Sequence, residues 1–103
     1  MQGNPQATRC INSIIGVGVK IKAGATVRDS VIFEDVVIES GAQIDHAIID
    51  SGTTVGSNCK IGKEGAGAGA ICVIAADLDV PANTVIPEGA MISRASDISK
   101  EVK

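Results

Sequence analysis

Aromatic side chains are almost absent from this sequence. Its 103 residues include no Trp and no Tyr, and Phe33 is the only aromatic residue, although hydrophobic residues make up 45% of the chain. A single domain of this size usually draws several large aromatic side chains into its core. The composition therefore favours a narrow core that Ile, Val and Ala can fill.

The sequence also has no cluster of like charges and no long apolar run. Nine basic and twelve acidic residues give a net charge of −3 without a basic cluster, so nucleic acid is not an expected partner. No apolar run approaches the roughly 20 residues that span a bilayer, and no signal peptide is visible. These absences predict a cytoplasmic protein without a membrane partner.

A unit of 17 residues occurs three times between Ile21 and Ile71. It reads IKAGATVRDSVIFEDVV, then IESGAQIDHAIIDSGTT, then VGSNCKIGKEGAGAGAI. The alignment places Ile21, Ile38 and Val55 in one column and Val27, Ile44 and Ile61 in another. A fixed period of this length is typical of a repeat architecture.

Within each unit the aliphatic residues recur about every six residues. A helix has a period of 3.6 and a strand a period of two, so neither alone explains this spacing. The position three residues before each of ten such aliphatics always holds Gly, Asn or Asp. These residues are Asn12, Gly18, Gly24, Asp35, Gly41, Gly52, Asn58, Asp77, Asn83 and Gly89. Gly, Asn and Asp tolerate a left-handed backbone, which indicates a tight corner between short strands.

The pattern predicts an all-β fold in which three short strands and three corners form one turn of a prism. We expect a single-stranded left-handed parallel β-helix of about five coils over residues 10–92. Its handedness follows from the known hexapeptide-repeat pattern and not from the periodicity. Residues 1–9 are expected to be a lead-in, and residues 93–103 a tail or a short cap.

Two stretches depart from the regular coil. Residues 62–71, GKEGAGAGAI, indicate a loop excursion or a slack side of the prism, and they lack the Lys-Ser/Thr pair of a phosphate-binding loop. Pro81 and Pro87 each follow an inward aliphatic residue. Because proline cannot donate to a strand ladder, these positions indicate the last coil, whose edge needs protection.

The three cysteines are an odd number without CxxC spacing, so the sequence indicates neither a disulfide framework nor a zinc site. Cys10 falls in the inward aliphatic column and Cys59 in a column of small inward residues. We expect both thiols to be buried and inert. Cys72 lies beside the irregular stretch, and its environment is left open.

The sequence offers no convergent catalytic or metal-binding group. His46 is the single histidine and could act as a general base. Its column in the alignment also holds Asn12, Asp29 and Lys63, and such a polar column is most simply explained as a solvent-exposed face. Phe33 stands where an aliphatic residue is expected, in a column with Gly16 and Asp50. We therefore expect Phe33 to face outward and to contact another domain or subunit, with local packing as the alternative.

One family resembles most of this chain. The run from NSIIGVGVKIKAGATV to DSVIFEDVV, the phrase HAIIDSGTTVG and the closing VPANTVIPEGAMI resemble the C-terminal left-handed β-helix of bacterial glucose-1-phosphate adenylyltransferase, also called ADP-glucose pyrophosphorylase. The resemblance covers residues 10–92. Hexads alone also occur in many acyltransferases, so the 17-residue spacing and these phrases carry the specificity.

The resemblance implies an enzyme that joins ATP and glucose 1-phosphate into ADP-glucose and pyrophosphate with Mg²⁺, for glycogen synthesis. In that family the chemistry lies in an N-terminal nucleotidyltransferase domain, whose GGxGTRL loop this sequence does not contain. The resemblance therefore implies no catalytic residue, cofactor site or metal site here. It implies a β-helix that supports oligomer assembly and helps to form an effector site, whose basic residues have no clear match in this sequence.

Two other hypotheses remain at this point. A small hexapeptide-repeat acyltransferase would need its histidine on a protruding loop, whereas His46 lies in register inside a repeat. A free-standing β-helix scaffold would need no chemistry at all. If a covering domain is missing, coil 1 around Cys10 exposes a strand edge and part of the core, and the isolated chain is expected to self-associate, end to end or through the Phe33 face.

Overall fold

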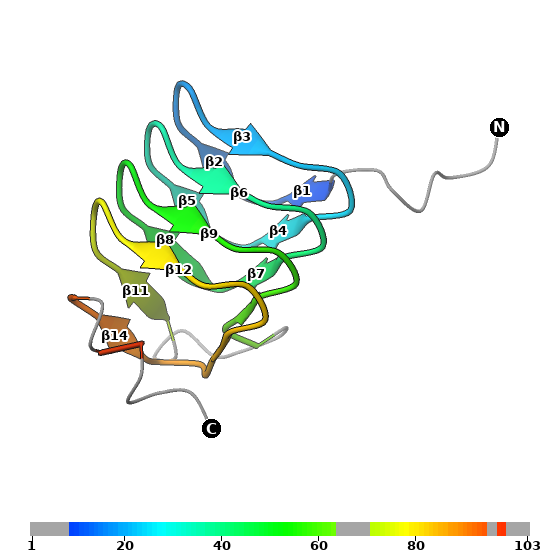
Figure 1. The fold of residues 1–103 in the computed structure, drawn as a ribbon. Helices are drawn as coiled ribbons and strands as arrows, with labels where there is room; N and C mark the ends of the chain where they lie inside the picture. Colours follow the sequence, from blue (N-terminus) through cyan, green and yellow to red (C-terminus); the bar gives the residue numbers. More distant parts are fainter. Residues whose placement is uncertain (1–8, 64–70, 95–96, 99–103) are drawn as a thin grey trace, which may run out of the picture.

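The chain winds into a triangular prism of short parallel strands (Figure 1). The structure is a computed structural model that describes residues 9–63, 71–94 and 97–98. Sheet A contains, in spatial order, β1 (Arg9–Ile11), β4 (Thr26–Arg28), β7 (Gln43–Asp45), β10 (Lys60–Ile61) and β13 (Val85–Ile86). Sheet B contains β2 (Ile14–Ile15), β5 (Val31–Ile32), β8 (Ala47–Ile49), β11 (Cys72–Ile74) and β14 (Met91–Ile92). Sheet C contains β3 (Lys20–Ile21), β6 (Val37–Ile38), β9 (Thr54–Val55) and β12 (Asp79–Val80).

Successive strands belong to successive sheets, so one coil takes one strand from each sheet. The strands pair in parallel with the coils before and after. Fourteen strands in the described residues make nearly five coils. The predicted left-handed parallel β-helix is confirmed.

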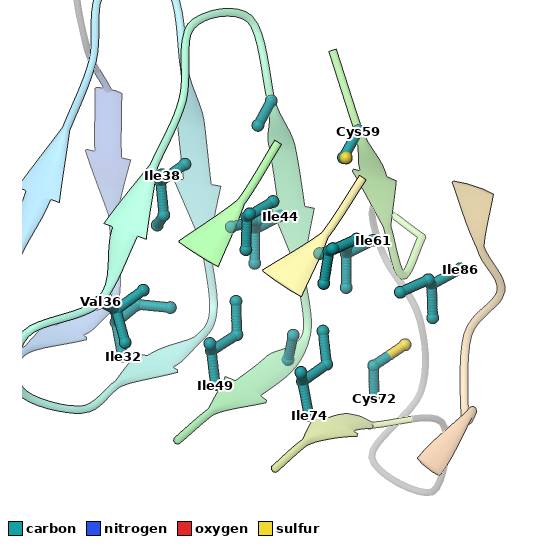
Figure 2. Packing of buried hydrophobic residues seen from close by; sticks show 14 of the residues in the cluster. Ile32, Val36, Ile38, Ile44, Ile49, Cys59, Ile61, Cys72, Ile74 and Ile86 are labelled. Atoms are coloured by element: carbon teal, nitrogen blue, oxygen red, sulfur yellow. The ribbon is translucent and has the colours of Figure 1, made fainter. Parts of the chain in front are cut away.

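The aliphatic residues of the six-residue pattern line the inside of the prism. The two predicted columns are confirmed by the strand pairing: Val27, Ile44 and Ile61 in sheet A, and Ile21, Ile38 and Val55 in sheet C. Figure 2 shows Ile44, Ile61 and Ile86 of sheet A pointing into the same interior as Ile49 and Ile74 of sheet B. Full burial of such a side chain contributes about 1.5–3 kcal/mol, so these columns hold the coils together.

The corners use the left-handed backbone that the sequence predicts. All ten residues selected from the pattern have φ between 53° and 79°. Asp29, His46 and Gly62 also have positive φ, at 51°, 50° and 79°. Corner 1, between sheets A and B, carries Asn12, Asp29, His46 and Gly89; corner 2, between sheets B and C, carries Gly18, Asp35, Gly52 and Asp77; corner 3 carries Gly24, Gly41, Asn58 and Asn83.

At three corner positions a glycine is followed in the next coil by Asp or Asn, and the two residues share one space. At three places the side-chain oxygen of the next coil lies where a Cβ of the preceding glycine would project: Asp35 over Gly18, Asn58 over Gly41, and Asp77 over Gly52. The glycine supplies both the positive φ and the empty space. A side chain in both coils would collide at these three places, whereas at corner 1 the successive Asn12 and Asp29 side chains are joined by a hydrogen bond.

The irregular stretch is an insertion into the fourth coil. The register offset is 17 residues from Ile44 to Ile61 but 25 residues from Ala47 to Cys72, so eight extra residues lie between Ile61 and Cys72. The predicted loop excursion is thus confirmed by the register, although residues 64–70 lie outside the described residues. Val80, Ile86 and Ile92 then resume the pattern in strands at the edges of the three sheets, as Pro81 and Pro87 predict.

One prediction about the cysteines is wrong. Cys10 is exposed, although it pairs with the buried Val27 and occupies the inward column. The reason is its place in coil 1, where no described residue covers the inward position. Cys59 and Cys72 are buried, and their thiols donate to the carbonyl oxygens of Pro81 and Pro87 at 2.9 Å.

Candidate functional site

The two ends of the prism differ in how their cores are covered. At the C-terminal end, Ile98 is 5% exposed and packs in the same cluster as the coil aliphatics. At the N-terminal end, Ile15 is 37% exposed, whereas its ladder partners Ile32 and Ile49 are fully buried. Ile11, Ile14 and Val17 of the same coil are also exposed. Within the described residues the core is therefore open at its N-terminal end, as the sequence predicts for a chain without its covering domain.

An apolar row follows the outside of sheet B. We define the sheet B stripe as Ile14, Val31, Ile48, Val73 and Met91, which pair in register from coil 1 to coil 5. Their chain neighbours point inward, so these five side chains point outward. Ile14 is 69% exposed and Met91 is 67% exposed, while the three residues between them are half-buried.

The other two outer faces are polar. The equivalent row on sheet A is Thr26, Gln43, Lys60 and Val85, and that on sheet C is Lys20, Val37, Thr54 and Asp79. Ion pairs join coils on these faces, with Arg28 Nε 2.5 Å from Asp45 Oδ1 on sheet A and Lys22 Nζ 3.3 Å from Glu39 Oε1 beside sheet C. Asp45 is buried, and Arg28 makes a second contact to its Oδ2 at 3.3 Å. Among the described residues, the outer face of sheet B is thus the most apolar of the three.

Phe33 lies at the edge of the sheet B stripe. It follows β5, its backbone N–H donates to the carbonyl oxygen of Ile49 at 2.9 Å, and its side chain is 43% exposed. A Cβ on Gly16 of the coil before would come within 2.9 Å of the Phe33 carbonyl carbon, so the two backbones are in close contact. The outward orientation is as predicted. That Phe33 contacts another domain or subunit stays a prediction.

His46 lies in corner 1 and not on a protruding loop. Its N–H donates to the carbonyl oxygen of Arg28 at 3.1 Å, and its own carbonyl accepts from the N–H of Cys72 at 3.0 Å. Its Nδ1 is buried and has no hydrogen-bond partner within the described ranges. The backbone of His46 is therefore held by hydrogen bonds to the coils on both sides, which does not fit the histidine on a protruding loop that an acyltransferase would require.

An open groove runs along corner 1. It has a volume of about 440 Å³ and is lined by Asn12, Ile14, Asp29, Ser30, Val31 and His46. The Asn12 amide donates to Asp29 Oδ1 at 2.8 Å, which continues the corner ladder. The groove thus joins the polar corner to the first half of the sheet B stripe.

The described residues contain no group of three His, Cys, Asp or Glu side chains that could hold a metal ion. Burial raises the pKa of the Cys59 thiol above its ordinary value, and hydrogen bonds with Thr84, Asn83 and Gly56 oppose this effect. A raised pKa keeps the thiol protonated and unreactive. In the part of the chain that is described, no helix is long and apolar enough to cross a membrane.

The sequence pattern predicts the outward Phe33 but not the sheet B stripe. Ile14, Val31 and Ile48 align at 17-residue spacing in the phrases NSII, DSVI and HAII. That signal is visible in the sequence. Val73 and Met91 join the row only when the eight-residue insertion is taken into account.

Comparison with known proteins agrees with this architecture. The chain is 30% identical over 90 residues to a glucose-1-phosphate adenylyltransferase of Pasteurella multocida, a match that covers 87% of this chain and 17% of that protein. It is 40% identical over 50 residues to a glucose-1-phosphate adenylyltransferase of Rhodopirellula baltica, which covers 48% of this chain and 11% of that protein. The chain thus spans less than a fifth of the length of these relatives.

A family model described as GMPPB C-terminal domain matches residues 5–103. The model extends over the whole described prism, including the open coil 1 and the residues beyond Ile92. Together with the two relatives, it confirms the resemblance to the C-terminal β-helix domain of glucose-1-phosphate adenylyltransferase, at modest identity. The chain belongs to the GMPPB C-terminal domain family.

Proposed function

We propose that this chain serves as the C-terminal β-helix of a cytoplasmic nucleotidyltransferase of the glucose-1-phosphate adenylyltransferase type. The observation that carries the proposal is the match of residues 5–103 to a C-terminal domain family, together with two relatives of which the match covers only 17% and 11%. The whole enzyme would form ADP-glucose and pyrophosphate from ATP and glucose 1-phosphate with Mg²⁺, in glycogen synthesis. The β-helix would not be catalytic by itself.

Its role in the enzyme would be assembly and regulation. The open end of the core supports this role, because Ile15 and the exposed Ile11 and Val17 would be covered by an N-terminal nucleotidyltransferase domain. The outward Phe33 and the sheet B stripe offer further surface for subunit contacts. An effector that binds between the two domains would then act on the position of the prism.

The native mass of the protein tests this proposal. An antibody against this chain should detect, in extract of the source cells, a band several times larger than 10.4 kDa. The immunoprecipitate should form ADP-glucose from ATP and glucose 1-phosphate, and EDTA should abolish that activity. A band at 10.4 kDa, or a large protein without nucleotidyltransferase activity, would contradict the proposal.

A further inference from the structure

We propose that the sheet B stripe binds the stripe of a second copy of this chain, with the two prisms antiparallel and a two-fold axis at Ile48. This inference deepens the assembly role proposed above by naming its surface and geometry. In this arrangement Ile14 of one copy packs on Met91 of the other, Val31 packs on Val73, and Ile48 packs on itself.

The stripe has the composition of an interface core. Five apolar side chains follow one another without a charged residue, and its two end residues are the most exposed of the five. Exposed apolar rows of this kind mark interaction sites. Under the two-fold, the exposed Ile14 and Met91 cover each other, and the half-buried residues meet in the middle.

The size of the face sets the expected affinity. Four strand spacings of about 4.8 Å separate Ile14 from Met91, so the contact is about 19 Å long. With the corner residues on both sides, two copies would bury roughly 1,000 Å² in total, at the low end for a specific interface. A dissociation constant of about 10–100 µM is therefore expected for the isolated chain.

Charge at corner 2 favours antiparallel prisms. The register places Glu34 in coil 2 and Arg94 in coil 5 of one outward column beside the stripe. Both are exposed, and neither makes an ion pair within the described residues. The antiparallel two-fold brings Arg94 of each copy within one coil spacing of Glu34 of the other, which forms two symmetric ion pairs at the rim.

The parallel arrangement is less favourable. It would place Asp29 of corner 1 opposite Glu34 of the partner's corner 2, twice, and like charges in such positions repel. Among the described residues nearest the stripe, the antiparallel arrangement brings the two Asp50 side chains together near the axis. Asp50 Oδ1 already accepts the N–H of Ser51 at 2.7 Å, which offsets part of that repulsion.

Sedimentation equilibrium of the full chain, between about 1 and 500 µM, measures the association. A monomer–dimer equilibrium is expected, and Ile48→Lys should abolish the dimer because the change occurs twice at the axis. Thr54→Lys is the matched control, since it places the same charge on the outside of sheet C in the same coil. A monomer at the highest concentration, or equal dimerisation of both variants, overturns the proposal.

Charge reversal tests the geometry. Glu34→Arg and Arg94→Glu should each weaken the dimer several-fold, and the double variant should restore it, which a merely destabilised chain would not do. Asp50→Asn should tighten the antiparallel dimer, whereas tightening by Asp29→Asn instead would indicate parallel prisms and overturn this geometry. The dimerisation of these variants does not depend on the native mass of the protein in the source cells. A failed dimer proposal can therefore be told apart from a failed nucleotidyltransferase proposal.

Discussion

Each corner of the prism depends on single residues that accept a left-handed backbone. Gly52 has φ of 75°, and the Asp77 carboxylate of the next coil occupies the space of its missing Cβ. Gly52→Ala would cost about 1–2 kcal/mol for the conformation alone. Because the new methyl group also collides with Asp77, we expect the free energy of unfolding to fall by more than this, as measured by urea titration.

The cause can be separated with a second substitution. Asp77→Gly removes the carboxylate and keeps a residue that adopts positive φ at low cost. The variant with both changes should therefore lose less stability than the sum of the two single variants. Additive losses would show that Asp77 does not limit the space above Gly52.

The buried thiol of Cys59 predicts a loss of stability at alkaline pH. Burial raises its pKa in the folded state above the ordinary value of about 9 that it keeps when unfolded. As pH rises above 9, the unfolded chain releases the proton while the folded chain retains it. The free energy of unfolding should therefore be unaffected below pH 9 and fall above it, by up to about 1.4 kcal/mol per pH unit.

Cys59→Ala is the control for this prediction. Ala25 and Ala42 occupy the same column in the coils before, so alanine fits the site. The difference in unfolding free energy between wild type and variant, measured by denaturant titration from pH 7 to pH 11, should shrink above pH 9. A constant difference would show that the Cys59 thiol does not titrate differently in the two states.

At this scale the sequence predicts most of the corners and misses a few. Ten corner positions follow from the pattern, because Gly, Asn and Asp are the residues that accept positive φ. His46 does not follow from the pattern, because its polar column predicts a solvated side chain and not a left-handed corner. The pattern predicts a buried Cys10 because its column is buried in every other coil, whereas burial in coil 1 depends on a neighbour outside the repeat.

At the scale of the element, the repeat predicts strands and register but not what the outer faces do. Inward columns follow directly from the six-residue period. The sheet B stripe needs three-dimensional register, because the insertion shifts Val73 and Met91 out of the 17-residue alignment. Phe33 stands out in the sequence as an exception to the pattern, whereas the apolar row beside it does not.

The insertion itself should be dispensable for folding. Deletion of residues 64–71 combined with Lys63→Asn would restore the 17-residue step and put a residue that tolerates positive φ at corner 1. Shortening a loop of this length changes closure entropy by only about 0.6 kcal/mol per halving, so the stability should be nearly unchanged.

Far-UV circular dichroism and urea titration of the deletion variant measure this outcome. The same deletion with Lys63 retained is the control, and it should be slightly less stable because lysine enters the left-handed corner. Loss of the β spectrum in both variants would show that the inserted residues are part of the coil and not an excursion from it.

At the scale of the whole molecule, a β-helix is stable only if its ends are covered. Each coil contacts its neighbours, so terminal coils depend on capping groups. Ile98 covers the last coil, whereas the first coil lies open in the described structure. This asymmetry is the structural link between the prism and the domain proposed to precede it.

Because the core is open at coil 1, equivalent substitutions along sheet B should differ in their cost to stability. Ile15 and Ile49 are equivalent residues of one ladder, but Ile15 is partly exposed and Ile49 is fully buried. Ile49→Ala should cost about 2–5 kcal/mol in the free energy of unfolding, the range for a buried aliphatic side chain. Ile15→Ala should cost clearly less in the 103-residue chain, as measured by urea titration, because water already reaches that site.

In a longer protein whose N-terminal domain covers coil 1, the two substitutions should become equally costly. Equal costs in the 103-residue chain would mean that coil 1 is covered without any further domain, and the open end would then lose its role in domain contact.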